Sequence, residues 1–304
     1  MTERRSFRCM GTVVTLVTAP PTRKRERRAL DAAFGIVRRT FVREDERFSR
    51  FRTSTEISRV NDAAGSWTEV SKPFLEVLEL SLEAARISGG LFDPTVLPAL
   101  LAAGYDGDFD EVLAGARLAL HPPEPCGRWP EIEIRDRSVL LPRGVAVDFG
   151  GIAKGWTSDR AARRIRKLLP WALVDAGGDL RVVGDIPAGG LSIAIEDPLD
   201  PTAEILRLQL ERGALATSSV TTRSWGENMH HLIDPRTAKP ADTDVLQATV
   251  WAPKCAAAEM GSKWALLAGE SILEQLPAVL VRKDGSAITN LLADDRSIDV
   301  VQPA

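Results

Sequence analysis

Cysteine is scarce in this sequence, and the few thiols present are far apart. Its 304 residues include only Cys9, Cys126 and Cys255, with no CxxC pair. An odd number of distant cysteines disfavours both a disulfide framework and a zinc site, and it favours reduced thiols in the cytoplasm. No run of about 18 apolar residues occurs, so we expect no membrane-spanning helix. The opening stretch MTERRSFRCMGTVVTL lacks the apolar core and cleavage site of a signal peptide.

The sequence also lacks an excess of charge of either sign. Lys and Arg number 39 against 42 Asp and Glu, which gives a net charge of −3, and 44% of the residues are apolar. This balance predicts a soluble globular protein with no overall field for nucleic acid or an anionic membrane. Two local basic clusters, residues 23–28 and 163–167, fall in helical patterns, and we interpret them as solvated helix faces.

The hydrophobic pattern predicts an α+β fold. A β-branched run at 7–18 indicates one strand. Strand-like segments follow one another directly after residue 130, and the last two form a hairpin with Asp-Gly at its turn. The proline-rich stretch 121–130 is the strongest linker signal, but it is too short to divide the chain, so we expect a single domain over 1–304. Helices are expected at 22–47, 73–88, 157–169 and 255–268.

One stretch, AVDFGGIAKGWTSDRA, combines an acid, three glycines and a lysine between a strand-like run and a helix. Glycines let a backbone approach a phosphate or a flat ring, and Lys154 can contact a phosphate. The alternative is a glycine turn with a capping Asp148 and a surface lysine. The stretch matches neither GxGxxG nor a P-loop, so its spacing alone leaves both interpretations open.

Other polar stretches are ambiguous in the same way. DAGGDL, residues 175–180, favours a tight turn between two strands. HHLIDPRT, residues 230–237, offers a histidine as general base, a metal ligand or a core histidine. Adjacent histidines on a strand point to opposite faces, so at most one serves a given site. Zinc is disfavoured because no cysteine or third histidine is near.

Two further segments carry polar groups at regular spacing. Glu259 and Lys263 lie four residues apart on a predicted helix, which is typical of an exposed ion pair unless that face lines a pocket. The stretch GALATSSVTTRSW places several hydroxyls at a predicted strand end. These hydroxyls suit either phosphate oxygens or a capped turn.

The order of these motifs resembles the ApbE family of FAD:protein FMN transferases from residue 7 to residue 285. The matching pieces are MGT, SRFRTSTEISRVN, GGLFDPTV, VDFGGIAKGWTSD, LVDAGGDLRVVG, LATSS and HLIDPRT. The resemblance implies tandem T-fold-like halves with antiparallel sheets, flanking helices and an FAD cleft between them. It also implies transfer of FMN from FAD to a Thr or Ser of an acceptor flavoprotein, with release of AMP. Hydrolysis of FAD to FMN and AMP, or flavin binding without catalysis, are the alternatives.

The resemblance also implies roles for individual residues. His231 matches the base that deprotonates the acceptor hydroxyl, and Thr217 supports the phosphate end. A Mg²⁺ ion would bind the carbonyl of Gly151 and the carboxylate of Glu259. The residues matched to flavin, adenine, ribose or phosphate contacts are Met10, Phe51, Leu91, Phe92, Asp93, Asp148 and Lys154.

The chain departs from the family pattern at two places. The family's late helix carries Asp and, four residues on, Thr as cation ligands, whereas this chain has Glu259 and Lys263. An ammonium has no acceptor atom and repels a cation. We therefore expect Lys263 to replace part of the cation's role as a catalytic residue, with a displaced Mg²⁺ site or lost activity as alternatives. Ala238 stands where a glycine usually follows the Asp-Pro-x-Thr motif, a change confined to a turn.

Overall fold

The computed structural model describes residues 2–107, 109, 112, 122, 124–200, 202–225, 229–291 and 298–301. The chain divides into two compact units, each made of separate chain segments. Unit 1 comprises Met1–Arg43, Lys154–Ser219 and Asp244–Ala304, and unit 2 comprises Glu44–Ala153 and Val220–Thr243. The proline-rich stretch 121–130 falls inside unit 2, and its residues 121 and 123 lie outside the described residues. A single domain with an FAD cleft between two halves stays a prediction.

Unit 1 is built on an antiparallel sheet of eight strands, in the order β1-β2-β6-β7-β10-β15-β16-β17. A smaller sheet has the order β18-β9-β8. The strands of the large sheet are β1 (Glu3–Cys9), β2 (Thr12–Thr18), β6 (Trp171–Ala176), β7 (Asp179–Gly184), β10 (Ala214–Ser219), β15 (Val245–Ala252), β16 (Ala278–Arg282) and β17 (Ala287–Thr289). The small sheet contains β8 (Leu191–Glu196), β9 (Glu204–Leu210) and β18 (Ile298–Val301). Every strand pair that the described residues form in this unit is antiparallel.

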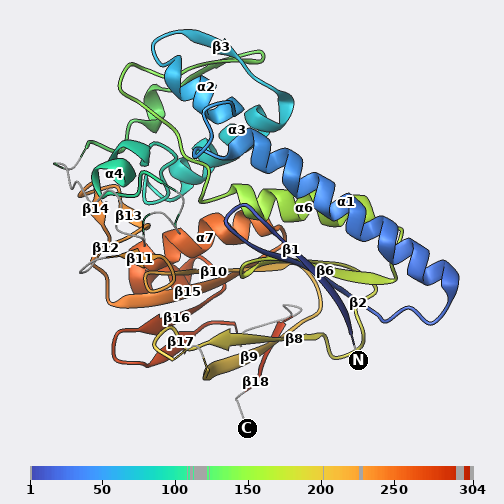
Figure 1. Cartoon of the computed structure of the whole chain (residues 1–304). Helices are drawn as coiled ribbons and strands as arrows, with labels where there is room; N and C mark the ends of the chain where they lie inside the picture. The colour runs from blue at the N-terminus through green and yellow to red at the C-terminus, as the bar shows by residue number, and fades with distance from the viewer. Residues whose placement is uncertain are drawn as a thin grey trace. The chain divides into compact units, whose positions relative to one another are not determined.

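Helices cover one face of the large sheet, and the small sheet covers the other (Figure 1). The helices are α1 (Lys24–Phe48), α6 (Ala153–Ile165) and α7 (Cys255–Ala268), followed by the 3-10 helix η2 (Gly269–Glu274). Strand β6 shows the alternation that this layering requires. Its residues Ala172, Val174 and Ala176 pack with α1 and α6, whereas Trp171 and Leu173 pack with β8 and β9.

The predicted strand at 7–18 is wrong as a single element, because these residues contain the end of β1, a turn and the whole of β2. Strands β1 and β2 pair from Glu3↔Thr18 to Cys9↔Thr12, with Met10 and Gly11 as a two-residue turn. Both turn residues have positive φ, 52° and 65°, as a type I′ turn requires. Methionine is not a usual residue for that turn, which is why the break is invisible in the sequence.

The remaining expectations for unit 1 are confirmed in position and differ in their ends. The predicted helix at 22–47 is α1, and the one at 255–268 coincides with α7. The helix predicted at 157–169 is α6, which begins four residues earlier, at Ala153, and ends at Ile165. The closing hairpin has its turn at Asp284 and Gly285, as expected. The α+β class with antiparallel sheets and flanking helices is confirmed.

Unit 2 contains short helices and small sheets. Its core includes a group of aromatic rings in which Phe149 meets Phe48 and Phe74 edge-on, at centroid distances of 5.7 and 5.1 Å. A three-stranded sheet has the order β3-β5-β4, and β11-β12 and β13-β14 are two-stranded pairs. The helices are α2 (Glu56–Asp62), α3 (Lys72–Ile87), α4 (Leu97–Ala102) and the 3-10 helix η1 (Trp129–Glu131). The strands are β3 (Trp67–Glu69), β4 (Glu133–Arg135), β5 (Ser138–Leu140), β11 (Ser224–Trp225), β12 (Met229–His230), β13 (Ile233–Asp234) and β14 (Lys239–Pro240).

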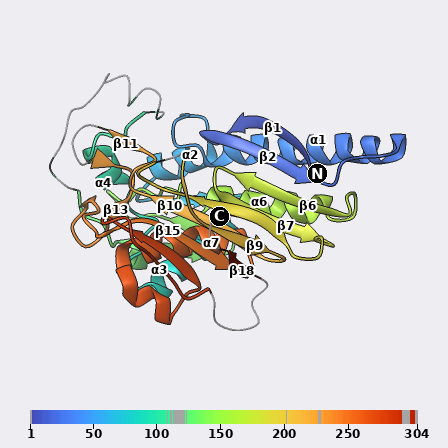
Figure 2. The ribbon, with the colours of Figure 1, turned by 90° about the horizontal axis from the view of Figure 1, so that it is seen from below.

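Figure 2 shows the same ribbon from below, with the unit 1 strands β6, β7 and β10 in sequence across the sheet. Within the part of the chain that the structure describes, no helix is both long enough and apolar enough to cross a bilayer.

Candidate functional site

The predicted site residues fall into two groups, one in each unit, and each group is described by itself. Unit 1 contains Met10, Lys154, Thr217, Glu259 and Lys263. Unit 2 contains Phe51, Leu91, Phe92, Asp93, Asp148, Gly151 and His231.

In unit 1, four charged side chains form a cluster that we call the buried charge cluster: Lys154, Asp179, Glu259 and Lys263. The Lys154 ammonium is bonded to the Asp179 carboxylate and lies 2.7 Å from Oε1 of Glu259. The same Oε1 is 3.6 Å from Nζ of Lys263, and Oε2 accepts a hydrogen bond of 2.8 Å from the backbone N–H of Gly155. Two ammonium groups thus balance two carboxylates, and the Glu259 side chain is fully buried.

A tight turn before β7 places Asp179 in this cluster. Asp179 begins β7 directly after a tight turn at Gly177 and Gly178, whose φ values are 68° and 91°. The tight turn predicted for DAGGDL is therefore confirmed. Asp179 also binds Lys154, a contact across 25 residues that the local sequence does not indicate.

Helices α6 and α7 approach each other closely at Gly155. A Cβ added to Gly155 would lie 2.6 Å from the carbonyl oxygen of Cys255, so only glycine fits there. The carboxylate of Asp159, one turn further along α6, accepts hydrogen bonds from the N–H groups of Cys255 and Ala256 at the start of α7. This cross-helix cap fixes α7 and with it the positions of Glu259 and Lys263.

These contacts change the interpretation of the glycine-rich stretch. At Gly155 the close approach is made by the protein's own backbone, and a Cβ on Gly150 would meet Oδ1 of Asp148 at 2.8 Å. Asp148 closes the glycine turn locally and does not cap α6, since its Oδ1 accepts the N–H of Gly150 at 2.6 Å and α6 begins at Ala153. The surface position suggested for Lys154 is wrong, because its side chain is only 17% exposed and contacts two carboxylates. The exposed ion pair suggested for Glu259 and Lys263 is likewise wrong, because Glu259 is buried.

Burial and mutual charge shift the pKa values of the cluster. Burial disfavours the charged form of Lys154, but Asp179 and Glu259 outweigh it and raise the lysine pKa. Burial together with repulsion from Glu259 raises the pKa of Asp179 to about 7. Burial opposes ionisation of Glu259, yet the attraction of Lys154 and Lys263 lowers its pKa. Burial, with repulsion from Lys154, lowers the pKa of Lys263. Glu259 is thus the stronger acid and Asp179 the weaker.

The surroundings of Glu259 do not fit a divalent cation. Its two carboxylate oxygens already contact two ammonium groups and one backbone N–H. Ammonium groups offer no acceptor atom to a metal and repel its charge. Among the described residues, no group of three or more His, Cys, Asp or Glu side chains is arranged to hold a metal. The assignment of Gly151 and Glu259 as Mg²⁺ ligands stays a prediction, and the chemistry around Glu259 counts against it.

Hydroxyl groups of β10 lie beside this cluster. Ser218 Oγ is 2.7 Å from Ser262 Oγ and accepts a long hydrogen bond of 3.4 Å from Nζ of Lys263. Lys263 also donates to the carbonyl oxygen of Glu259 at 3.2 Å. The neighbouring Thr217 is half-buried, and its hydroxyl lies 2.8 Å from that of Thr249. Thr217 therefore lies within a strand and not in a capped turn.

In unit 2, Asp148 and Phe51 are connected by an arginine that the sequence did not single out. Nε of Arg50 is 3.0 Å from Oδ2 of Asp148, and its guanidinium lies 4.3 Å from the Phe51 ring centroid and 4.6 Å from that of Tyr105. We call Arg50, Phe51, Tyr105 and Asp148 the Asp148 group. The Nη2 of Arg50 is buried and has no hydrogen-bond acceptor among the described residues. Phe51 is 43% exposed.

The turn formed by Leu91, Phe92 and Asp93 lies next to this group. The carbonyl oxygen of Pro94 accepts the N–H of Asp148 at 2.9 Å. Asp93 is buried and accepts hydrogen bonds from the N–H and hydroxyl of Thr95 and from the N–H of Gly127. Through these hydrogen bonds Asp93 holds the loop in place. Leu91 is half-buried and Phe92 is buried.

The two adjacent histidines have different surroundings. His230 is buried, with Nε2 3.0 Å from the carbonyl oxygen of Ala241 and Nδ1 accepting the N–H of Leu232 at 3.3 Å. These partners suit a neutral ring that donates from Nε2, and burial lowers the His230 pKa. His230 is thus the core histidine, whereas His231 is half-buried and remains the candidate base.

Comparisons with known proteins agree with this architecture. The model of the ApbE family matches residues 10–284. An FAD:protein FMN transferase of Klebsiella pneumoniae is 28% identical over 66% of this chain and 64% of its own length. A second, from Rhodobacter capsulatus, is 28% identical over 78% of this chain and 45% of its length. The matched region thus spans less than two thirds of either relative. The crystal structure of the ApbE protein of Thermotoga maritima superposes with a TM-score of 0.82 at 24% identity, covering 95% of this chain and 97% of the other.

Proposed function

Since the chain belongs to the ApbE family, we propose that it transfers FMN from FAD to a Thr or Ser hydroxyl of an acceptor flavoprotein. In this reaction the acceptor oxygen attacks the phosphorus of the FMN half, and the bond from that phosphorus to the AMP oxygen breaks. The hydroxyl proton passes to a base, and AMP leaves with an additional negative charge. The observation that supports this proposal most directly is the buried charge cluster, in which Lys154 of the glycine-rich motif and Lys263 of α7 both contact Glu259.

The described side chains suggest a role for each residue in proton transfer or in FAD binding. His231 accepts the proton, since His230 is already used by the core. Phe51, with its exposed ring, and Leu91 line the surface against which a flavin or adenine packs. No described residue supplies an acceptor to the buried Nη2 of Arg50, and a phosphate oxygen or a ring carbonyl of FAD would satisfy it. Met10 adds an apolar contact, and Thr217 a hydroxyl for the phosphates.

We further propose that Lys263 supplies positive charge for the leaving AMP. A fixed ammonium near the diphosphate stabilises developing negative charge without any reorganisation during the reaction. Lys154 and Lys263 both contact Oε1 of Glu259, so that this carboxylate orients both lysines. No step of this mechanism passes through a divalent metal, because the residues around Glu259 do not fit one. A cytoplasmic location also stays a prediction, which rests on the cysteine content.

Product analysis tests the proposal. The protein is incubated with FAD and a purified acceptor flavoprotein that has a covalent FMN site, and AMP is followed by chromatography while the intact mass of the acceptor is recorded. We expect AMP and the FMN adduct in equal amounts. AMP with free FMN and no adduct would indicate a diphosphatase. FAD that binds and stays intact would contradict catalysis and leave a flavin-binding protein.

A further inference from the structure

The helices of unit 1 carry a concentration of positive charge that the proposed reaction does not use. Along residues 22–43 and 157–167, only two exposed acidic residues occur, Glu26 and Asp31. This contrasts with a net charge of −3 for the whole chain. We call the exposed cations of these segments the basic face. They are Arg23, Lys24, Arg25, Arg27, Arg28, Arg38, Arg39, Arg43, Arg163, Arg164, Arg166 and Lys167.

These cations share a layer because α1 and α6 pack on the same side of the large sheet. Leu30, Val37 and Phe41 of α1 belong to one core cluster with Ala161 and Ile165 of α6. The guanidinium of Arg164 also donates to the hydroxyl of Thr40 at 3.0 Å. With their apolar sides buried against the sheet, both helices turn their charged sides to solvent.

The two acids of the basic face already have other partners. Asp31 accepts a hydrogen bond of 2.5 Å from Arg5 of β1. Glu26 accepts the N–H groups of Thr22 and Arg23 and thereby caps the start of α1. Even if both carboxylates are counted at full charge, the twelve exposed cations leave the basic face with a large excess of positive charge.

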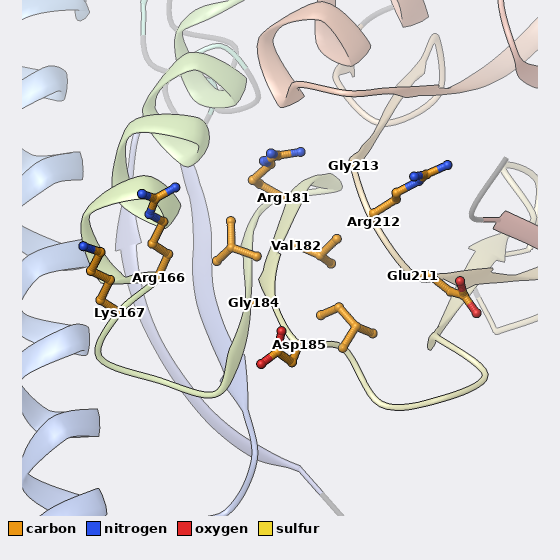
Figure 3. A pocket seen from close by; sticks show the side chains of 11 residues that line it. Arg166, Lys167, Arg181, Val182, Gly184, Asp185, Glu211, Arg212 and Gly213 are labelled. Carbon is orange, nitrogen blue, oxygen red and sulfur yellow. The ribbon is translucent and has the colours of Figure 1, made fainter.

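A pocket of about 460 Å³ adjoins the end of α6, where the basic face ends (Figure 3). Cations from three chain segments line it: Arg166 and Lys167 after α6, Arg181 on β7 and Arg212 after β9. Its acidic lining residues are Asp185 and Glu211, so the lining has a net positive charge. Arg181 is fixed by Asp159 at 3.3 Å and by the carbonyl oxygen of Pro253 at 2.5 Å. The pocket suits a carboxylate side chain better than a neutral one.

We propose that the basic face and its pocket form a docking surface for an acidic segment of the acceptor protein. The proposal rests on the proposed function, because only a transferase needs a protein partner in each turnover. Opposite charges speed the encounter of two proteins and orient them before contact. A protein suits this surface better than a bilayer, since Val42 is the one exposed large hydrophobic residue within the described segments 22–43 and 157–167, and a single valine inserts little apolar area into lipid.

Binding of a defined acidic probe tests the proposal without knowledge of the acceptor. The probe is a fluorescein-labelled poly-glutamate peptide of about twelve residues, titrated by fluorescence anisotropy at low and at physiological salt. We expect the wild-type protein to bind it and the affinity to fall steeply as salt increases. The double variant Arg25→Glu/Arg28→Glu should bind at least about ten-fold more weakly, and Arg166→Glu/Lys167→Glu should weaken binding as well.

A matched control changes the net charge equally at another place. Lys72→Glu/Arg86→Glu reverses two exposed cations on α3 of unit 2, whose side chains are 80% and 64% exposed. Equal affinities of this control and the Arg25/Arg28 variant would contradict the proposal, and so would binding to vesicles with phosphatidylserine but not to the peptide. FAD affinity, measured in the same variants by quenching of flavin fluorescence, separates this outcome from failure of the transferase proposal. Loss of docking should leave FAD affinity unchanged, because none of the reversed cations belongs to the proposed FAD contacts.

Discussion

The buried charge cluster of unit 1 and the Asp148 group of unit 2 both pair carboxylates with cations, but they differ in how far they are closed. In the cluster, the side chains of Glu259 and Asp179 are 0% and 2% exposed, and every charge has an opposite charge beside it. In the Asp148 group, Arg50 has a buried nitrogen that finds no acceptor within the part of the chain that the structure describes, and the Phe51 ring is open to solvent. The buried charge cluster holds its charges in fixed positions. The Asp148 group leaves a guanidinium nitrogen and an aromatic ring to contact a ligand. The cluster should therefore dominate stability, and the Asp148 group should dominate flavin binding.

Removing one cation from the cluster should give the largest effect. Lys154→Met leaves Asp179 and Glu259 buried with Lys263 as their only cation. Breaking a buried ion pair from one side costs about 3–5 kcal/mol, which we expect in the free energy of unfolding from urea denaturation. Lys254→Met, at the exposed start of α7, serves as the control and should change stability by less than about 0.5 kcal/mol. Similar losses for both variants would show that the cluster does not fix charge as described.

The raised pKa of Asp179 predicts a smaller, pH-dependent effect. Because its folded pKa of about 7 lies above the ordinary 3.8, the folded state holds this proton more tightly than the unfolded state. The associated stability is fully present below about pH 4 and is lost as the pH rises to about 7. The variant Asp179→Asn lacks this titrating group. The free energy of unfolding of the variant, relative to that of the wild type, should therefore rise between about pH 4 and pH 7, by a few kcal/mol at most. Urea denaturation across this range measures the difference, and parallel curves would contradict the assignment.

A change of about 1 kcal/mol is expected at the turn after the Asp-Pro-x-Thr motif. Ala238 has a φ of 55°, in the left-handed region that favours glycine, and its N–H bonds to the carbonyl of Asp234. Ala238→Gly relieves this strain and should raise the free energy of unfolding by up to about 1 kcal/mol. The greater conformational freedom of glycine in the unfolded chain reduces this gain. Ala257→Gly, on the exposed side of α7, should instead destabilise by about 1 kcal/mol. Thermal unfolding of both variants checks the opposite signs.

The smallest effect on stability should come with a clear effect on binding. Phe51→Ala removes a ring that is 43% exposed, so the free energy of unfolding should fall by less than about 1 kcal/mol. FAD binding, followed by quenching of flavin fluorescence, should weaken about ten-fold or more if the ring packs on the ligand. Unchanged FAD affinity would remove the Asp148 group from the binding surface.

The sequence predicted well the features that short-range patterns determine. Helix α7 was located correctly because its apolar residues have helical spacing and Gly269, with φ 67°, follows its end. The break at Met10 was missed because tertiary context overrides the usual turn preferences. The contact between Lys154 and Asp179 was missed because it joins distant segments. Glu259 and Lys263 were placed on one helix face, but their spacing does not reveal whether that face is buried.

The most direct test of the account is the metal dependence of FMN transfer by the wild-type protein and by Lys263→Thr. Acceptor, FAD and enzyme are incubated with EDTA or with excess Mg²⁺, and the intact mass of the acceptor is measured. If the chain supplies its own cation through Lys263, the wild type forms the adduct equally in both samples, and the variant loses transfer in EDTA. An adduct that the wild type forms only with Mg²⁺ would contradict this central claim.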